Sequence, residues 1–528
     1  MKSFLAAAAV IVLALAGAAQ DTGRQSPFES TAAPEVKNRI DEIVFAALKK
    51  QGIRPARLSS DAVFVRRVYL DAIGTLPTSD EARAFIEDRD PNKRSALIDR
   101  LLAREEFADY WAMKWCEVLR VKSEFPINLW PNAVQAYHRW IRTAIRDNVP
   151  YDRFARELLT ASGSNFRDAP VNFYRAVQSR DPQAIASTVA LTFMGARTDA
   201  WPKDRLTGMA AFFSQIGYKS TGEWKEEIVY FDPDKKAPAF APVSAGASAR
   251  LPDGTSVSLE PGQDPREAFA SWLTAPGNPW FARAAVNRAW FWVVGRGIVH
   301  EPDDIRDGNP PSHPELLAFL ERELVASRFD MKQVHRLIFN SSTYQLSSIP
   351  ASTPPPPDGS FAYALMRPLD AEVLIDALNQ ITGMSEEYSS AIPEPYTFIP
   401  PDQRSIALAD GSIRSAFLET FGRPTRDTGL ASERSTQPTA AQRLYLLNSG
   451  DVQRKLQQGP SLQALLQRQG GPRDVINALY LTILSRYPTD AELQAITAYS
   501  QAGGVNRRGV GQDLAWALIN SAEFGFRH

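Results

Sequence analysis

Five polar side chains between residues 278 and 320 have the types and spacing from which a functional site could be built. Arg283 and Asn287 lie four residues apart and therefore share one face of a helix. Asp303 and Asp304 follow in an acidic loop, and His313 stands at the start of the next helix. The functional interpretation is a polar pocket in which Arg283, Asn287, Asp303, Asp304 and His313 converge.

A structural interpretation explains the same residues. Buried charge must be paired, and ion-pair networks gather charged side chains as readily as active sites do. In this interpretation the arginines of the helix pair with the aspartates of the loop and fix the loop against the helix. Paired contacts without a pocket would favour it over the functional interpretation.

Known catalytic and metal-binding motifs are absent from the sequence. It contains no G-x-S-x-G, no P-loop, no G-x-G-x-x-G in a βαβ setting and no H-E-x-x-H. His313 with Asp303, Asp304 and Asp307 could ligate a hard cation, but their spacing matches no known motif. We therefore assign no catalytic residue, no metal site and no cofactor.

The elements that must position the five side chains are two helices and the loop between them. Asn278 and Pro279 predict a helix start, and the helix that follows is apolar on nearly every side, which is typical of full burial. Gly295 suits a left-handed helix end. Ser312 and Glu315 are spaced as a capping box for the second helix.

Hydrophobic periodicity along the rest of the chain predicts a mainly α protein, built from multi-helix domains with a small β insert around residues 221–262. A run of prolines, which lack amide hydrogens, marks a linker or surface loop. The predicted division is a signal peptide (1–19), a linker (20–33), an N-terminal helical domain (34–220), the β-rich insert (221–263), a central helical domain (264–346), the Pro-rich segment (347–360) and a C-terminal helical domain (361–528).

The N-terminus has the pattern of a secretory signal peptide. Lys2 precedes an apolar run at residues 4–15, and small residues follow at 16–18. We expect an exported protein, periplasmic or extracellular, with no transmembrane segment in the mature chain.

Net charge and cysteine content narrow the choice of partners and chemistry. The net charge is −1 at pH 7, so no overall field attracts nucleic acid, and we expect none to bind. The single cysteine, Cys116, excludes an intrachain disulfide. Its apolar neighbours indicate a small buried side chain rather than a reactive thiol.

Several runs of the sequence resemble a known pair of domains. FVRRVYLDAIGTLPTSDEARAFIED and LIDRLLAREEFADYWAMKWCEVLR resemble the planctomycete cytochrome C-type domain of unknown function 1549. NPWFARAAVNRAWFWVVGRGIVHEPDDIRDGNPPSHPELLAFL resembles its usual companion, domain of unknown function 1553. The resemblance extends from about residue 61 to residue 528 and implies no assigned activity.

The chain departs from this family where cysteines are expected. The resemblance implies a Cys-x-x-Cys-His run before an aromatic segment, but residues 193–213 read FMGARTDAWPKDRLTGMAAFF. It also implies a Cys pair ahead of Glu-Arg, where residues 426–434 read RDTGLASER. Covalent c-type haem needs both thiols and the axial His, so haem and electron transfer through it are excluded.

Two functions follow as hypotheses. The first is an exported helical interaction or scaffold protein of the cell envelope, working with an envelope protein partner in polymer breakdown. The alternative is an extracytoplasmic enzyme, a hydrolase acting on polysaccharide, that uses the Arg283–His313 region. The absence of catalytic motifs favours the first.

Overall fold

The computed structural model of the chain describes residues 26–235, 248–259, 262–502 and 506–528. The predicted signal peptide, the start of the predicted linker and part of the predicted β insert lie outside these ranges. Helices account for 54% of the chain and strands for 6%, which confirms the mainly α fold. None of the described helices is long and apolar enough to cross a membrane.

The N-terminal block is a bundle of helices whose ends carry capping residues. Thr78 and Glu81 form a capping box, and Gly74 ends the preceding helix with a left-handed φ of 60°. The helices of this block are α2 (Arg39–Lys50), α3 (Asp61–Ile73), α4 (Ser79–Glu87), α5 (Lys93–Leu102), α6 (Glu105–Val118), α7 (Pro131–Arg146), α8 (Tyr151–Thr160), α9 (Asn172–Arg175), α10 (Pro182–Val189) and α11 (Lys203–Ala210).

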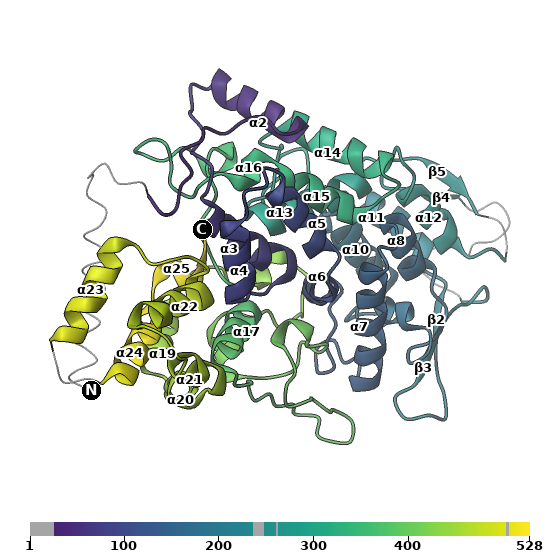
Figure 1. The fold of residues 1–528 in the computed structure, drawn as a ribbon. Coiled ribbons are helices and arrows are strands. Elements are labelled where there is room, and N and C mark those ends of the chain that lie inside the picture. Colours follow the sequence, from purple (N-terminus) through teal and green to yellow (C-terminus); the bar gives the residue numbers. More distant parts are fainter. Residues whose placement is uncertain (1–25, 236–247, 260–261, 503–505) are drawn as a thin grey trace.

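The β insert is present, but it starts earlier than predicted and recruits a strand from the N-terminal block. The antiparallel sheet has the order β1-β3-β2, with β1 (Gly163–Ser164), β2 (Ile216–Ser220) and β3 (Glu227–Phe231). Its β2–β3 hairpin projects from the helical mass beside α7 (Figure 1). A second small hairpin pairs β4 (Ser248–Arg250) with β5 (Ser256–Ser258).

The remaining helices form the second half of the molecule, and α19 to α24 gather at the end opposite the β2–β3 hairpin (Figure 1). They are α12 (Pro265–Leu273), α13 (Phe281–Val294), α14 (Pro314–Ala326), α15 (Met331–Asn340), α16 (Ser342–Gln345), α17 (Ala371–Thr382), α18 (Ala416–Thr420), α19 (Ala440–Asn448), α20 (Gly450–Gln458), α21 (Pro460–Leu466), α22 (Pro472–Leu484), α23 (Asp490–Gln501), α24 (Arg507–Ile519) and α25 (Ala522–Gly525). The last strand, β7 (Phe526–Arg527), pairs with β6 (Arg367–Pro368).

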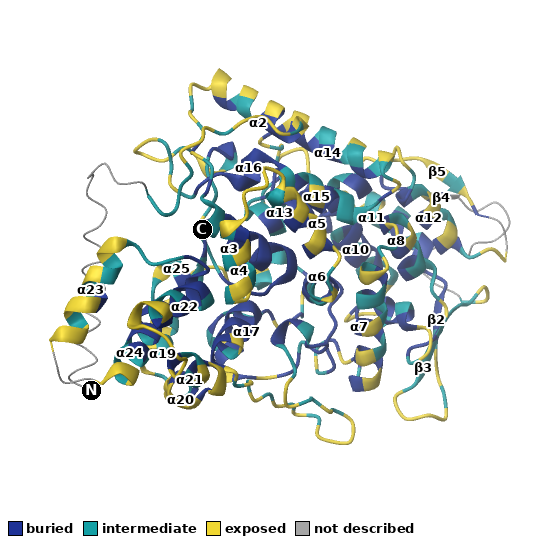
Figure 2. Cartoon of the chain, in the orientation of Figure 1, coloured by how far each residue is buried: buried dark blue, intermediate teal, exposed yellow. Residues whose placement is uncertain are grey.

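One continuous apolar core runs through both halves, from α2 to α25. Buried residues are dense in α3, α6, α13 and α17, whereas α2 and α23 expose much of their surface (Figure 2). The predicted loop at 347–360 begins against the N-terminal block, since the Ser347 amide donates to the Arg57 carbonyl at 2.7 Å. Cys116 is fully buried, as predicted, and burial raises the pKa of its thiol to about 12.

Helix α13 is largely buried and ends at Gly295 with a φ of 92°, as predicted, but two details of the central stretch differ. The helix begins at Phe281 rather than at Pro279, because the Asn278 side chain accepts hydrogen bonds from the amides of residues 280 and 281. The predicted capping box of α14 does not form: Ser312 donates to the Ile298 carbonyl instead.

Candidate functional site

Asn287 fastens the loop after α13 to the helix. Its amide nitrogen donates to the Val299 carbonyl at 2.9 Å, and its carbonyl accepts the Val299 amide hydrogen at 2.8 Å. Both groups of the side chain are thus used on one backbone position, and the side chain is fully buried. The buried backbone at Val299 is satisfied by this pair of bonds.

An ion pair between Asp303 of the loop and Arg288 of α13 attaches the loop to the helix a second time. The two side chains are each 2% exposed and meet at 2.9 Å. The other Asp303 oxygen accepts the Ala431 amide hydrogen at 2.6 Å. Arg288 also donates to the carbonyls of Leu191 and Thr192, at 3.2 and 2.8 Å. This Arg288–Asp303 pair therefore joins α13, the loop, the end of α10 and the segment around residue 431.

The other three predicted site residues have separate partners. Arg283 pairs with Glu321 of α14 at 2.7 Å, and Asp304 pairs with a neighbouring arginine of its own loop. The His313 ring lies 5.1 Å from the Phe361 ring, and burial lowers the pKa of its imidazole. None of these three contacts pairs an arginine of the helix with an aspartate of the loop, as the structural interpretation expects; the Arg288–Asp303 ion pair does. A chemical role for the five residues stays a prediction.

The two segments where the family resemblance implies cysteines both bond to the loop that carries Asp303. The end of α10 widens into a π turn over Ala190–Met194, which closes at Gly195 with a φ of 59°. The Gly195 carbonyl accepts the Ile305 amide hydrogen at 2.8 Å. Residue 431, in the second such segment, bonds to Asp303. The loop at residues 303–305 thus connects the two cysteine-free segments.

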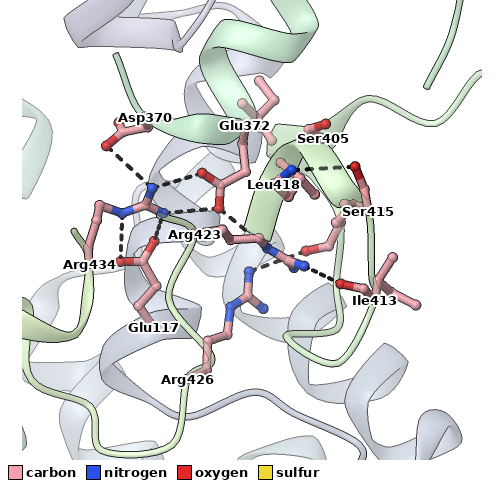
Figure 3. A network of polar contacts seen from close by, with 12 residues as sticks. Glu117, Asp370, Glu372, Ser405, Ile413, Ser415, Leu418, Arg423, Arg426 and Arg434 are labelled. Atoms are coloured by element: carbon pink, nitrogen blue, oxygen red, sulfur yellow. Dashed lines mark hydrogen bonds and ion pairs between the residues drawn. The ribbon is translucent and has the colours of Figure 1, made fainter. Parts of the chain in front are cut away.

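A larger cluster of buried charge, which the sequence did not reveal, surrounds Arg434 (Figure 3). Its guanidinium contacts Glu117 of α6 at 2.6 Å and Glu372 of α17 at 2.8 Å. Arg423 lies 3.5 Å from the same Glu372 carboxylate and donates to the Ile413 carbonyl at 2.6 Å. We call Glu117, Asp370, Glu372, Arg423 and Arg434 the charge clamp.

The clamp continues to the end of the chain through Asp370. This carboxylate contacts Lys114 of α6 and Arg527 of β7, each at 3.0 Å. Arg527 also contacts Asp71 of α3 at 2.8 Å, and the Tyr344 hydroxyl donates to Asp71 at 3.0 Å. Elements of both halves of the chain thus share one network of buried charges.

The electrostatics of the clamp hold its groups in the charged state. Burial favours the neutral acid at Asp370, but Lys114 and Arg527 outweigh it and hold the pKa of that carboxyl well below its usual range. Burial is likewise outweighed at Glu372, where Arg434 lowers the pKa. Carboxylates fixed as anions do not exchange protons near neutral pH, so the clamp fits a structural role.

Asp376 is a buried carboxyl whose pKa is raised, unlike those of Asp370 and Glu372. Burial raises its pKa to about 6, against the opposing effect of Arg404 at 3.6 Å. Because the folded pKa lies above the unfolded value, the stabilisation is complete below about pH 4 and is lost as the pH rises through 6, by about 3 kcal/mol. We expect Asp376→Asn to remove this part of the pH dependence of unfolding by denaturant. An unchanged slope, equal to that of the exposed-site control Asp80→Asn, would contradict the assignment.

His335 lines an aromatic cavity of about 40 Å³ with Trp111 and Tyr151. Its Nδ1 lies 2.8 Å from the Met331 carbonyl, so Nδ1 carries the proton, and burial lowers the pKa to about 4. Its Nε2 has no hydrogen-bond partner in the described part of the chain. Across the same ranges, no three His, Cys, Asp or Glu side chains are grouped as metal ligands.

Comparison with known proteins assigns the chain to a family. The model described as a protein of unknown function (DUF1549) matches residues 39–216, and the one described as a protein of unknown function (DUF1553) matches residues 265–500. No curated protein and no solved structure matches the chain. The protein belongs to the family in which a DUF1549 domain is followed by a DUF1553 domain, and with its single cysteine it lacks a Cys-x-x-Cys-His motif.

Proposed function

We propose that the protein is an exported helical scaffold of the cell envelope, which presents a rigid surface to a binding partner. The charge clamp is the observation that carries this proposal. It joins Lys114 and Glu117 of the DUF1549 domain to Asp370, Glu372 and Arg434 of the DUF1553 domain by buried ion pairs. Two domains joined by buried ion pairs in this way hold the outer surfaces that they form together in a fixed relative position.

The surface that would meet a partner is formed by three loops that meet through the rings of Trp130, Trp224 and Tyr396. We call residues 124–130, 221–226 and 392–402 the aromatic surface. Among the described residues, every exposed large aromatic side chain lies within it, and their exposed fractions are 85% for Phe125, 63% for Trp224, 48% for Tyr396 and 66% for Phe398. Exposed aromatic side chains gathered in one place are typical of interaction sites.

Native mass spectrometry of the full chain, purified gently from its own host, tests the proposal. We expect the wild type to carry additional mass and the Trp224→Ala/Tyr396→Ala variant to lose it, because both rings are exposed and contribute to binding rather than to folding. Met366→Ala, at a side chain of matching exposure outside the aromatic surface, is the control and should keep the additional mass. A wild type that carries no partner, or a partner retained by the double variant, would contradict the proposal.

A further inference from the structure

Four arginines from two neighbouring segments lie together at the end of the molecule that α19 to α24 form. The Arg507 guanidinium, at the start of α24, donates to the Gly470 carbonyl at 2.9 Å and so holds α24 against the loop between α21 and α22. All four arginines are exposed, and none of them forms an ion pair with another described residue. We call residues 467–473 and 506–508 the arginine surface, and its arginines are Arg468, Arg473, Arg507 and Arg508.

The arginine surface offers positive charge without apolar contact. Its two segments contain no acidic residue, and none of the exposed large hydrophobic side chains of the described chain lies in them. The adjacent carboxylate of Asp474 is used at the start of α22, where it accepts the Gly471 amide hydrogen at 2.8 Å. Guanidinium groups bind carboxylates in bidentate geometry and stack on aromatic rings. A partner that suits this surface therefore presents carboxylates and aromatic rings together.

The aromatic surface of the same chain presents both groups. Its carboxylates at Glu223, Glu394 and Asp402 are exposed and form no ion pair among the residues that the structure describes. Its exposed rings are those of Phe125, Trp224, Tyr396 and Phe398. Protein interfaces are enriched in this combination of aromatic and arginine side chains, so the two surfaces are complementary in charge and in chemistry.

Lys225 shows how the aromatic surface accommodates a cation. It is the one basic residue of the three segments, and its ammonium lies 5.2 Å from the ring centroids of both Trp130 and Trp224. Such contacts between a cation and a ring face are attractive. No described cation lies over the rings of Phe125 and Phe398, so these two rings remain open to the guanidinium groups of a partner.

The arginine surface and the aromatic surface lie too far apart to meet within one copy of the chain. Glu223 and Trp224 belong to the turn of the β2–β3 hairpin, whereas α22 and α24 lie at the opposite end of the molecule (Figure 1). A contact between them must therefore join two copies. Because it uses two different surfaces, it leaves one surface of each kind free, and further copies add until a ring closes or an open chain grows.

We infer that the arginine surface of one copy binds the aromatic surface of a second copy, head to tail. This inference rests on the proposed scaffold function and names its partner. The guanidinium groups of one copy pair with the carboxylates of the other and stack on its aromatic rings. Salt screens exposed ion pairs, so the association weakens as the ionic strength rises.

Analytical ultracentrifugation of the full chain tests the inference, over a range of protein concentrations at low ionic strength and at about 0.5 M salt. We expect the wild type to form species heavier than one chain at low ionic strength and to dissociate in high salt. Arg468→Ala/Arg508→Ala should weaken the association about tenfold or more, because two guanidinium contacts are lost. Arg57→Ala/Arg322→Ala, at exposed arginines outside both surfaces, is the matched control and should associate as the wild type does.

A mixing experiment tests the head-to-tail arrangement. Arg468→Ala/Arg508→Ala keeps an intact aromatic surface, and Trp224→Ala/Tyr396→Ala keeps an intact arginine surface. Each variant alone should be monomeric at concentrations at which the wild type associates. An equimolar mixture should form dimers and nothing larger, since each variant has one competent surface. A mixture without dimers, or with larger species, would overturn the arrangement.

The outcomes separate the inference from the function on which it rests. A wild type that stays monomeric, or an association that Arg468→Ala/Arg508→Ala retains, overturns the inference. Dextran sulfate that binds the monomeric wild type but not this variant would assign the arginine surface to a polyanion instead. If native mass spectrometry then still shows another partner that Trp224→Ala/Tyr396→Ala loses, the scaffold function stands. Without such a partner, both fail.

Discussion

Arg434→Met is expected to destabilise the protein by about 3–5 kcal/mol, because it leaves buried carboxylates without their main partner. In the wild type this guanidinium faces Glu117 and Glu372 at 2.6 and 2.8 Å and Asp370 at 3.5 Å. Methionine fills a similar volume but compensates none of this charge. The loss is measured as the shift in the free energy of unfolding by urea, at pH 7.

A surface arginine provides the matched control. Arg153 pairs with Glu157 one turn away on the exposed face of α8, so Arg153→Met should cost only about 0.5 kcal/mol or less. Equal losses at the two positions would show that Arg434 does not hold the clamp together. Combining Arg434→Met with Glu372→Gln should recover part of the loss, because one of the unpaired charges is removed.

The effect of Arg434→Met should also depend on pH. The folded pKa values of Asp370 and Glu372 are depressed, so their contribution to stability is present above about pH 4 and is lost as the pH falls through the folded values. In the variant the same carboxyls are protonated more readily. The difference between wild type and variant should therefore shrink as the pH is lowered from 7 towards 3.

Asp303→Asn is expected to destabilise the protein by about 3–5 kcal/mol, because it too leaves a buried charge without its partner. The substitution leaves the Arg288 guanidinium, itself 2% exposed, without a carboxylate partner. It also weakens the bond from the Ala431 amide, which Asp303 accepts at 2.6 Å. Besides the loss of stability, hydrogen exchange at Ala431 should accelerate, since the attachment of that segment is loosened.

The adjacent aspartate is the control for this prediction. Asp304 pairs with Arg306 at the surface of the same loop, so Asp304→Asn should cost less than about 1 kcal/mol. If the two substitutions destabilised the protein equally, the Arg288–Asp303 pair would not be the attachment of the loop. If hydrogen exchange at Ala431 did not change, the bond from its amide to Asp303 would not protect that amide from exchange.

Local structure could be predicted from the sequence because its signals are local. The left-handed glycine at 295 forms as expected, and the capping boxes at Thr78 and Thr489 each depend on a glutamate only three residues away. The predicted start of α13 was wrong by two residues, because Asn278 caps the amides of residues 280 and 281 rather than placing Pro279 in the helix.

Long-range pairing could not be predicted in the same way. Glu117 and Arg434 meet although 317 positions separate them in the sequence. A signal was present, since Glu117 and Glu372 interrupt apolar helices and a buried carboxylate needs a partner. The sequence contains 59 lysines and arginines, however, and nothing local indicates which of them supplies it. The aromatic surface could not be predicted from the sequence for the same reason, because its rings come from three loops that are distant in the sequence.

Differential scanning calorimetry of the full chain most directly tests the claim that the charge clamp makes the two family domains one rigid scaffold. We expect a single cooperative transition for the wild type, which moves to lower temperature in Arg434→Met while Arg153→Met leaves it in place. Two separate transitions in the wild type, with neither affected by Arg434→Met, would contradict it: the DUF1549 and DUF1553 domains would then unfold independently.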